Sequence, residues 1–268
     1  MSKVPETREE QLHAIRHWLP QDHWYKPPLC TTVVNLSRFI MQVMNTVEFR
    51  GRDRWDAVLS DRSRGILSFS NHTSLFDDPL LISNLGTTRY QEVRWIAADH
   101  KNFFGSKLKG IIFSAGKCVP IIRGGGLGQP GFEFLSERLR AGEWVHIFPE
   151  GGRTREANAL LRTPFKVGIG RLMVEARPIV MPFYHRGMDS VLPIGRVLPR
   201  RGNRVIVEFG EATDIDALWL KEHVDPALEP MAQWTHATEW TQRQLEALQE
   251  HVMSDADGHS PGSPSGAT

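Results

Sequence analysis

The sequence predicts an α/β protein, a mixed, largely parallel sheet flanked by helices, with an amphipathic helix near the N-terminus. Three observations support this fold class. Short apolar runs of strand length alternate with segments of helical periodicity along the 268 residues. Several runs end in polar residues and glycine, as strands do where α/β sheets bind ligands. The chain is also long enough to bury a sizeable core, either as one large domain or as a domain with extensions.

The N-terminal part is expected to be an arm followed by a helix. Residues 1–28 are polar at first and then rich in aromatic residues and proline. Over residues 29–47, apolar side chains recur at helical spacing with polar ones between them. This helix either packs on the core of the domain or lies in a membrane interface, with its apolar face below the headgroups.

The remaining elements alternate through a domain expected over residues 48–253. Asp77-Asp78-Pro79 marks one helix start, because Asp near a helix start and Pro in its first turn are start signals. Strands are predicted at residues 46–50, 65–70, 93–98, 116–122, 144–148, 179–183 and 204–209. Helices are predicted at residues 53–59, 79–85, 132–141, 165–176 and 235–252. The tail, residues 254–268, is rich in Gly, Ser and Pro and is expected to be disordered.

The composition argues against several functional classes. The net charge of +1 provides no overall field that would select nucleic acid or an anionic membrane. Cys30 and Cys118 form neither a disulfide framework nor a CxxC motif, and both are expected to be buried free thiols. No apolar run approaches the ~20 residues of a membrane-spanning helix. The first residues resemble neither a signal peptide nor a transit peptide, so membrane contact is expected to be peripheral.

The most informative stretch, residues 71–79, follows the apolar run at residues 65–70 and places His72 five positions before Asp77. A neutral imidazole at a strand end can remove a proton from an attacking hydroxyl near neutral pH. Asp77 can accept a hydrogen bond from the other ring nitrogen and stabilise the imidazolium as it forms. The hydroxyl is expected to belong to the substrate, because the chain has no GxSxG nucleophile motif.

Two other interpretations of His72 stay open on the residues alone. The side chain could be a structural histidine that a carboxylate holds at a helix start. It could also be a metal ligand, although no other His or Cys stands at ligand spacing to it. His100, His146 and His185 each stand alone and are expected to be structural or surface residues.

A second cluster, residues 148–154, follows another apolar strand. Gly151 and its neighbour permit close approach of the backbone to a ligand. Arg153 can hold a phosphate bidentately. Glu150 can accept bonds from backbone amides or help to orient a substrate. The alternative is a glycine turn with a surface arginine.

A third segment, residues 116–126, repeats this arrangement: a strand ends, Arg123 follows, and glycines come next. Arg123 is therefore a second candidate phosphate contact. The apolar run at residues 179–183 indicates only core or the wall of an acyl-chain site. Together the clusters predict acyl transfer to a hydroxyl on a phosphate-bearing substrate.

These stretches resemble, in order, the four motifs of the glycerolipid acyltransferase family, over roughly residues 45–215. Within the family, the chain is most similar to the tafazzin branch. The matching segments are Asp77-Asp78-Pro79 and residues 116–120, 144–151, 168–172, 185–188 and 191–193.

The resemblance implies the family's α/β fold, with His72 as general base and Asp77 as its partner. The implied substrate-binding and phosphate-binding residues are Arg123, Glu150, Gly151 and Arg153. The tafazzin branch implies acyl movement between phospholipids and lysophospholipids such as monolysocardiolipin, without acyl-CoA and without a metal or nucleotide cofactor. The implied partners are these lipids and a membrane surface, with no nucleic acid. The expected location is peripheral: on a mitochondrial membrane in a eukaryote, or on the cytoplasmic face of the inner membrane in a bacterium.

Two departures from the tafazzin pattern leave alternatives. Gly152-Arg153-Thr154 resembles the general family motif, where tafazzins carry a Lys-Val pair. The alternative function is therefore a 1-acylglycerol-3-phosphate or lysophospholipid acyltransferase that uses acyl-CoA or acyl carrier protein. The N-terminal apolar segment is also shorter and more polar than in tafazzins, so membrane contact would depend on residues 29–47. A non-catalytic lipid-binding protein of the same fold is a third possibility.

Overall fold

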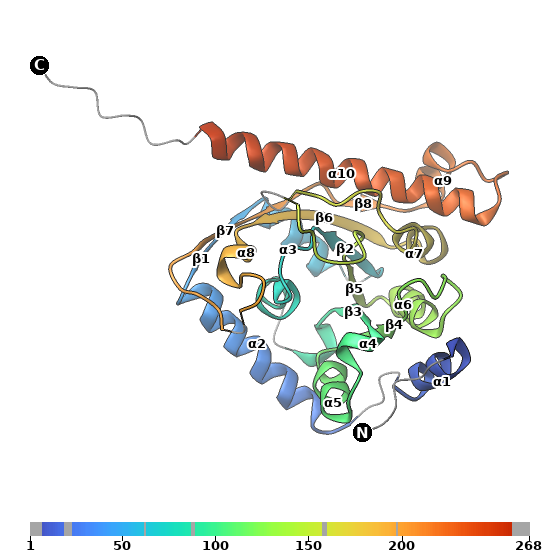
Figure 1. Ribbon diagram of the computed structural model, residues 1–268. Coiled ribbons are helices and arrows are strands. Elements are labelled where there is room, and N and C mark those ends of the chain that lie inside the picture. The colour runs from blue at the N-terminus through green and yellow to red at the C-terminus, as the bar shows by residue number, and fades with distance from the viewer. Residues whose placement is uncertain are drawn as a thin grey trace, which may run out of the picture.

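The computed structural model is an α/β domain in which one sheet lies between two layers of helices (Figure 1). The structure describes residues 7–18, 23–61, 63–86, 89–156, 160–196 and 198–258. Helices α7 (Gly168–Ala176) and α10 (Pro230–Gly258) cover one face of the sheet. Helices α2 (Lys26–Gln42) and α3 (Arg52–Ser60) cover the other.

The sheet has 8 strands, in the order β1-β7-β6-β2-β5-β3-β4, with β8 also pairing β6. Neighbouring strands are parallel except where β6 pairs with β7 and β8. The strands are β1 (Thr46–Arg50), β2 (Ile66–Ser70), β3 (Trp95–Asp99), β4 (Cys118–Ile121), β5 (Trp144–Ile147), β6 (Ile179–Arg186), β7 (Arg204–Phe209) and β8 (Thr213–Asp214). The mixed, largely parallel sheet expected from the sequence is confirmed.

The other helices are α1 (Arg8–Trp18), α4 (His100–Phe103), α5 (Lys107–Ala115), α6 (Pro130–Arg140), α8 (Met188–Val191) and α9 (Ala217–His223). Of these, only α6 has a counterpart among the predicted elements. Helix α5 packs closely against α1, because Gly110 leaves room for a ring: a Cβ there would lie 2.1 Å from Cζ3 of Trp18. This contact joins segments that are far apart in the sequence, and local periodicity does not reveal it.

Both ends of the chain differ from the expectation. The helix expected over residues 29–47 begins at Lys26 and ends at Gln42, because residues 46–50 form β1. Prolines in its first turn are tolerated there, since that turn has no hydrogen-bond partner for their missing N–H groups. The expected N-terminal arm contains α1. Helix α10 extends to Gly258 into the tail expected to be disordered, and residues 259–268 lie outside the described residues.

The helix expected over residues 79–85 is a π-helical turn, Asp77–Leu81, followed by a 3₁₀ turn, Ile82–Asn84. A second 3₁₀ turn covers Tyr90–Glu92. The π turn begins at the buried Asp77, whose carboxylate also accepts hydrogen bonds from backbone N–H groups before the turn. Wide turns of this kind are frequent at functional sites.

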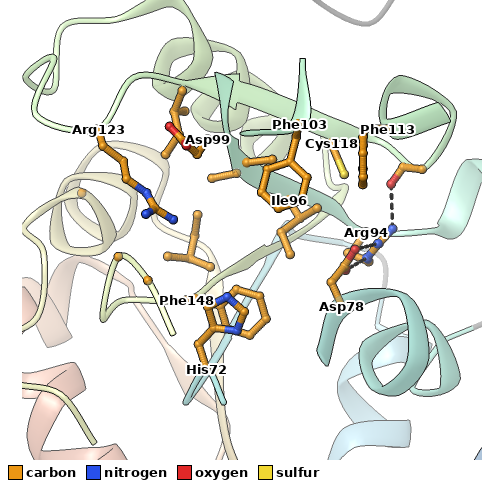
Figure 2. Close-up of a pocket in the computed structure, with 18 of the residues that line it drawn as sticks. His72, Asp78, Arg94, Ile96, Asp99, Phe103, Phe113, Cys118, Arg123 and Phe148 are labelled. Carbon is orange, nitrogen blue, oxygen red and sulfur yellow. Dashed lines mark hydrogen bonds and ion pairs between the residues drawn. The ribbon is translucent and has the colours of Figure 1, made fainter. Parts of the chain in front are cut away.

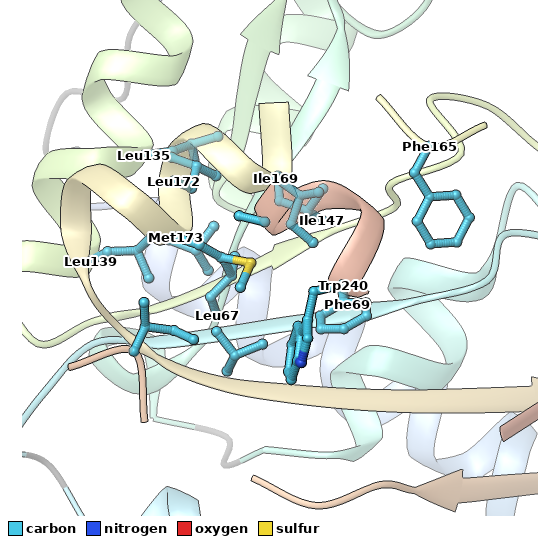
Figure 3. Packing of buried hydrophobic residues seen from close by; sticks show 14 of the residues in the cluster. Leu67, Phe69, Leu135, Leu139, Ile147, Phe165, Ile169, Leu172, Met173 and Trp240 are labelled. Atoms are coloured by element: carbon cyan, nitrogen blue, oxygen red, sulfur yellow. The ribbon is translucent and has the colours of Figure 1, made fainter. Parts of the chain in front are cut away.

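Both faces of the central strands are buried, which explains the nearly continuous apolar runs in the sequence. On one face, β2 and β5 pack against α6, α7 and α10 (Figure 3). On the other face, the indole ring of Trp55 stacks at 5.6 Å on Phe209, and its Nε1–H donates to the carbonyl of Leu85 at 2.6 Å. Each fully buried large apolar side chain contributes about 1.5–3 kcal/mol. The two cores fix the strands from both sides.

The strand order determines where the candidate residues meet. Strands β6, β2 and β5 are adjacent and parallel, with Phe69 of β2 paired with both Ile147 and Pro182. Their carboxyl ends therefore lie at one edge of the sheet, where α/β proteins bind ligands. The segments that follow β2 and β5 are the two polar clusters singled out in the sequence.

Candidate active site

The centre of the site is a His–Asp pair at the carboxyl end of β2. Nδ1 of His72 lies 3.0 Å from Oδ2 of Asp77. The side chain of Asp77 is fully buried, whereas that of His72 is 14% exposed. The pairing expected from the five-residue spacing is thus present in the structure. It leaves Nε2 of His72 as the ring nitrogen that can exchange a proton with a ligand.

Several donors converge on the Asp77 carboxylate. Oδ2 accepts hydrogen bonds from the backbone N–H groups of Thr73 at 2.7 Å and Ser74 at 2.9 Å. Burial by itself would raise the pKa of Asp77, but His185 and the hydrogen bond from His72 outweigh burial and hold that pKa below its usual value. Asp77 is therefore a carboxylate at neutral pH and can stabilise an imidazolium at His72.

His185, expected to be a structural or surface residue, lies directly behind this pair. Its Nε2 is 3.7 Å from Oδ2 of Asp77 and 3.0 Å from the carbonyl oxygen of Asn71. The side-chain amide of Asn71 in turn bonds the backbone carbonyl and N–H of His185, at 2.8 and 2.9 Å. Burial lowers the pKa of His185, although Asp77 opposes this. These hydrogen bonds connect the residue that follows β2 to β6, and they hold His185 next to Asp77.

Glu150 holds the loop that carries His72. Its Oε1 accepts a hydrogen bond from the backbone N–H of His72 at 2.6 Å, and its Oε2 accepts one from that of Arg162 at 2.9 Å. Burial raises the pKa of Glu150 to about 7, against the effect of the two N–H groups. Of the two roles considered from the sequence, the structure gives Glu150 contacts to backbone amides. The backbone N–H of Thr154 also donates a hydrogen bond to the carbonyl of His72 at 2.7 Å.

Phe148 orients the His72 ring. The two rings are stacked, with centroids 4.0 Å apart and planes at 12°. Figure 2 shows the stacked pair at the base of the cavity. Phe148 thus contacts one face of the imidazole, and Asp77 holds its Nδ1 edge, so the orientation of the ring is fixed. His146, below Phe148, is fully buried, and its Nδ1 lies 2.8 Å from Oγ of Ser68, in agreement with the structural role expected of it.

A cavity of about 880 Å³ opens at His72. Most of its wall is apolar and comes from α2, α4, α5 and strands β3 and β4, through residues such as Val34, Phe103, Phe113 and Cys118. Such a wall suits a hydrocarbon chain and offers it few polar groups. Burial raises the pKa of both thiols, Cys30 and Cys118, which line the cavity as unreactive groups.

The other side of the cavity is basic. Arg123 extends toward His72 and Phe148 from across the cavity (Figure 2). Arg162 and Lys166 also line this side, and neither was singled out in the sequence. Their signal was weak, because each is a basic residue in a segment without a glycine turn. Gly151 has φ +69°, a conformation that favours glycine, and a Cβ there would lie 2.8 Å from Cγ of Lys166.

Arg153 is half-buried near the site but is not among the described residues that line the cavity. Burial lowers its pKa, as do Arg155 and Arg123, while Asp77 opposes the change. Arg153 is therefore close enough to Arg123 and Asp77 to interact with their charges. Of the two arginines, Arg123 lies in the cavity wall.

A buried ion pair interrupts the apolar wall. Arg94 is 3% exposed and donates from Nε to Oδ1 of Asp78 at 2.6 Å, while its Nη1 donates to the carbonyl of Gly116 at 2.9 Å. The guanidinium thus joins the turn that begins at Asp77 to the segment just before β4 (Figure 2). A buried pair with these hydrogen bonds fixes the wall, and loss of one partner would leave an uncompensated charge.

Within the described ranges, no group of three or more His, Cys, Asp or Glu side chains is arranged to hold a metal ion. None of the helices in those ranges combines the length and apolar character needed to cross a bilayer.

Comparison with known proteins gives a consistent result. Residues 46–186 match the protein family described as Acyltransferase. The chain is 31% identical over 207 residues to a tafazzin from Drosophila melanogaster, which covers 74% of this chain and 54% of that protein. It is 30% identical over 220 residues to a protein named taffazin from Dictyostelium discoideum, covering 77% and 75%. The chain thus matches about half the length of the Drosophila protein.

A third relative, the N-acylphosphatidylethanolamine synthase of Arabidopsis thaliana, is 30% identical over 262 residues, covering 89% of this chain and 91% of that protein. Among solved structures, the 1-acyl-sn-glycerophosphate acyltransferase PlsC from Thermotoga maritima matches with a TM-score of 0.54 at 17% identity, over 88% of each chain. At that identity, the likeness concerns the fold alone.

Proposed function

Because this chain belongs to the acyltransferase family and has tafazzins among its relatives, we propose that it moves an acyl chain from a phospholipid to the free hydroxyl of a lysophospholipid. One observation carries the proposal. The His72–Asp77 pair opens into a cavity with an apolar wall for the chain on one side and Arg123 on the other. The activity is thus remodelling of glycerophospholipids, with cardiolipin and its lyso form as candidate substrates.

The transfer needs no nucleophile from the protein. Nε2 of His72 removes the proton of the lysolipid hydroxyl while that oxygen attacks the ester carbonyl of the donor. The tetrahedral intermediate then collapses, the bond from carbonyl carbon to donor oxygen breaks, and His72 returns the proton to the departing alkoxide. Asp77 accepts from Nδ1 throughout and stabilises the imidazolium between the two steps.

The rest of the cavity would place the substrates. The guanidinium of Arg123 would bind a substrate phosphate bidentately, with Lys166 as a second cation on the same side. Arg153 would add positive potential from its half-buried position, and Gly151 would let the backbone approach the headgroup. The acyl chain would lie along the wall formed by α2, α5, β3 and β4.

The donor is proposed to be a phospholipid. The tafazzin relatives support this assignment, while Gly152-Arg153-Thr154 motivates the alternative donor, an acyl thioester. Both donors present an acyl carbonyl to the same base, so the geometry of His72 and Asp77 does not discriminate between them. The assay below separates the two.

We further propose a peripheral membrane location. One face of α2 packs on the domain through Cys30, Val34 and Met41, and the opposite face exposes Leu36 and Phe39. The helix therefore has features of both roles considered for it, core packing and a membrane interface. The membrane would be mitochondrial in a eukaryote, or the cytoplasmic face of the inner membrane in a bacterium.

A second candidate function differs in the acceptor. The Arabidopsis relative, aligned over 89% of this chain, is named for N-acylation of phosphatidylethanolamine, in which an amine takes the acyl group. The same base could serve an amine acceptor in this chain. Mild alkaline methanolysis of the product distinguishes the two functions, because it cleaves an ester and leaves an amide intact.

The test is acyl transfer by the purified protein from phospholipid vesicles to a labelled lysophospholipid, with and without added acyl-CoA. Transfer from phospholipid alone is expected, with loss of activity in His72→Ala and normal activity in the control His236→Ala, an exposed histidine on α10. Transfer only with acyl-CoA would replace the phospholipid donor with the thioester. Full activity in His72→Ala would refute the assigned base, and release of free fatty acid alone would indicate a hydrolase.

A further inference from the structure

The loop between α8 and β7, residues 193–203, carries exposed side chains that acyl transfer does not use. We name this segment the basic loop; all of it except residue 197 is described. Ile194 is 61% exposed and Leu198 is 79% exposed. Arg196, Arg200 and Arg201 are also exposed, and none of the three forms an ion pair with a described residue.

The basic loop starts beside the catalytic pair and ends beside α2. At its start, the carbonyl of Leu192 accepts a hydrogen bond from Oγ of Ser74 at 3.2 Å, within the turn between His72 and Asp77. At its end, the N–H of Gly202 donates to the carbonyl of Met44 at 2.8 Å. Figure 1 shows the loop, in orange, next to the C-terminal end of α2.

The exposed apolar face of α2 therefore continues into the basic loop. Val43, at the end of α2, is 68% exposed, and Leu75, on the turn after His72, is 48% exposed and lines the cavity. Val33 of α2, which is 36% exposed, also lines the cavity, so the cavity reaches this surface at Val33 and Leu75. Apolar side chains flanked by arginines are typical of segments that insert below anionic lipid headgroups.

We propose that the basic loop binds the anionic headgroups of a phospholipid bilayer, so that the cavity mouth faces the bilayer. Arg196, Arg200 and Arg201 contact the headgroups, and Ile194 and Leu198 enter the acyl boundary. The inference rests on the proposed function only in taking a phospholipid bilayer as the partner. It adds a dependence on anionic lipid, which the chain's net charge of +1 does not predict.

Two contributions to binding can be separated. Each arginine at an anionic surface strengthens binding by roughly five-fold, and this gain weakens as salt rises. The apolar side chains contribute to binding whatever the headgroup charge. The loop should therefore raise affinity for anionic vesicles selectively, through its arginines.

The experiment measures binding of the full chain to vesicles of phosphatidylcholine, with and without phosphatidylglycerol, by co-sedimentation. Arg200→Gln with Arg201→Gln should weaken binding to the anionic vesicles by roughly 30-fold and leave binding to neutral vesicles unchanged. The matched control, Lys221→Gln with Arg243→Gln, removes the same charge from exposed positions on α9 and α10 and should bind like the parent.

A second pair of variants tests the apolar part. Leu198→Ser should weaken binding to both kinds of vesicle, whereas Leu218→Ser, which removes a leucine 61% exposed on α9, should not. Equal losses in the two charge pairs, or no preference of the parent for anionic vesicles, would overturn the proposal.

Acyl-transfer assays test the proposed function independently of vesicle binding. His72→Ala should bind vesicles like the parent, since the base takes no part in docking. If the parent binds anionic vesicles but transfers no acyl chain under any donor, the proposed function fails and the docking surface stands. If the parent transfers acyl chains but shows no preference for anionic vesicles, the docking surface fails and the proposed function stands.

Discussion

Replacing Asp77 with Asn tests the central claim about the site while keeping its shape. The asparagine carbonyl oxygen can occupy the position of Oδ2 and still accept from the N–H groups of Thr73 and Ser74. The negative charge 3.0 Å from Nδ1 of His72 is lost. At an effective dielectric constant of about 20, that charge stabilises an imidazolium by roughly 5 kcal/mol.

This energy corresponds to about four orders of magnitude in rate. The amide dipole recovers part of the loss, so kcat is expected to fall by roughly 10³- to 10⁴-fold, with little change in KM. The assay is initial-rate acyl transfer to a labelled lysophospholipid, with Asp53→Asn, at an exposed site on α3, as the control. A correctly folded Asp77→Asn protein that keeps more than about a tenth of the parent activity would refute the pairing as a catalytic element.

Three further outcomes are expected. Arg123→Gln should raise KM for the lysophospholipid by roughly 10- to 100-fold with kcat largely retained, because one charged hydrogen-bonding partner of the phosphate is lost; an unchanged KM would place the phosphate elsewhere. Cys118→Phe should fill part of the apolar cavity and shift transfer toward shorter acyl chains, as measured by competition between donors of two chain lengths; an unaltered preference would mean that the chain lies elsewhere. Burial raises the pKa of Glu150 to about 7 in the folded protein, so the fold binds its proton more tightly than the unfolded chain does. The stability from this group is present at about pH 4 and is lost as pH rises to about 7, a difference of about 3 kcal/mol, which should be missing from Glu150→Gln in denaturant titrations at several pH values.

The strands and the contact between His72 and Asp77 could be predicted from the sequence. The buried strand before His72 reads as a continuous apolar run because helices cover both faces of the sheet. The spacing from His72 to Asp77 was sufficient to predict their hydrogen bond, because the turn between them is local. Arg123 was found because an arginine followed by glycines at a strand end is a local pattern, and the structure places it in the cavity wall.

The residues that sequence reasoning missed act over long separations. His185 appeared to be an isolated histidine, and only the pairing of β6 with β2 brings it behind Asp77. Lys166 enters the cavity from a segment without a recognisable motif. Helix α1 is short and polar, and it packs through Trp18 at a glycine of α5, which local periodicity does not reveal. Tertiary contacts, rather than local preference, determine all three.

The hydrogen bonds that hold the His72 loop also affect the order in which parts of the protein fold. The bond from the N–H of His72 to Glu150 closes a separation of 78 residues, and those between Asn71 and His185 close one of 114. Contacts so distant in sequence form only after long loops close, so they come late and slow folding. The nascent chain therefore carries both members of the pair long before it can hold them in place. A fragment that ends before β6 would contain His72, Asp77 and Glu150 but would lack His185, the partner of Asn71 and Asp77.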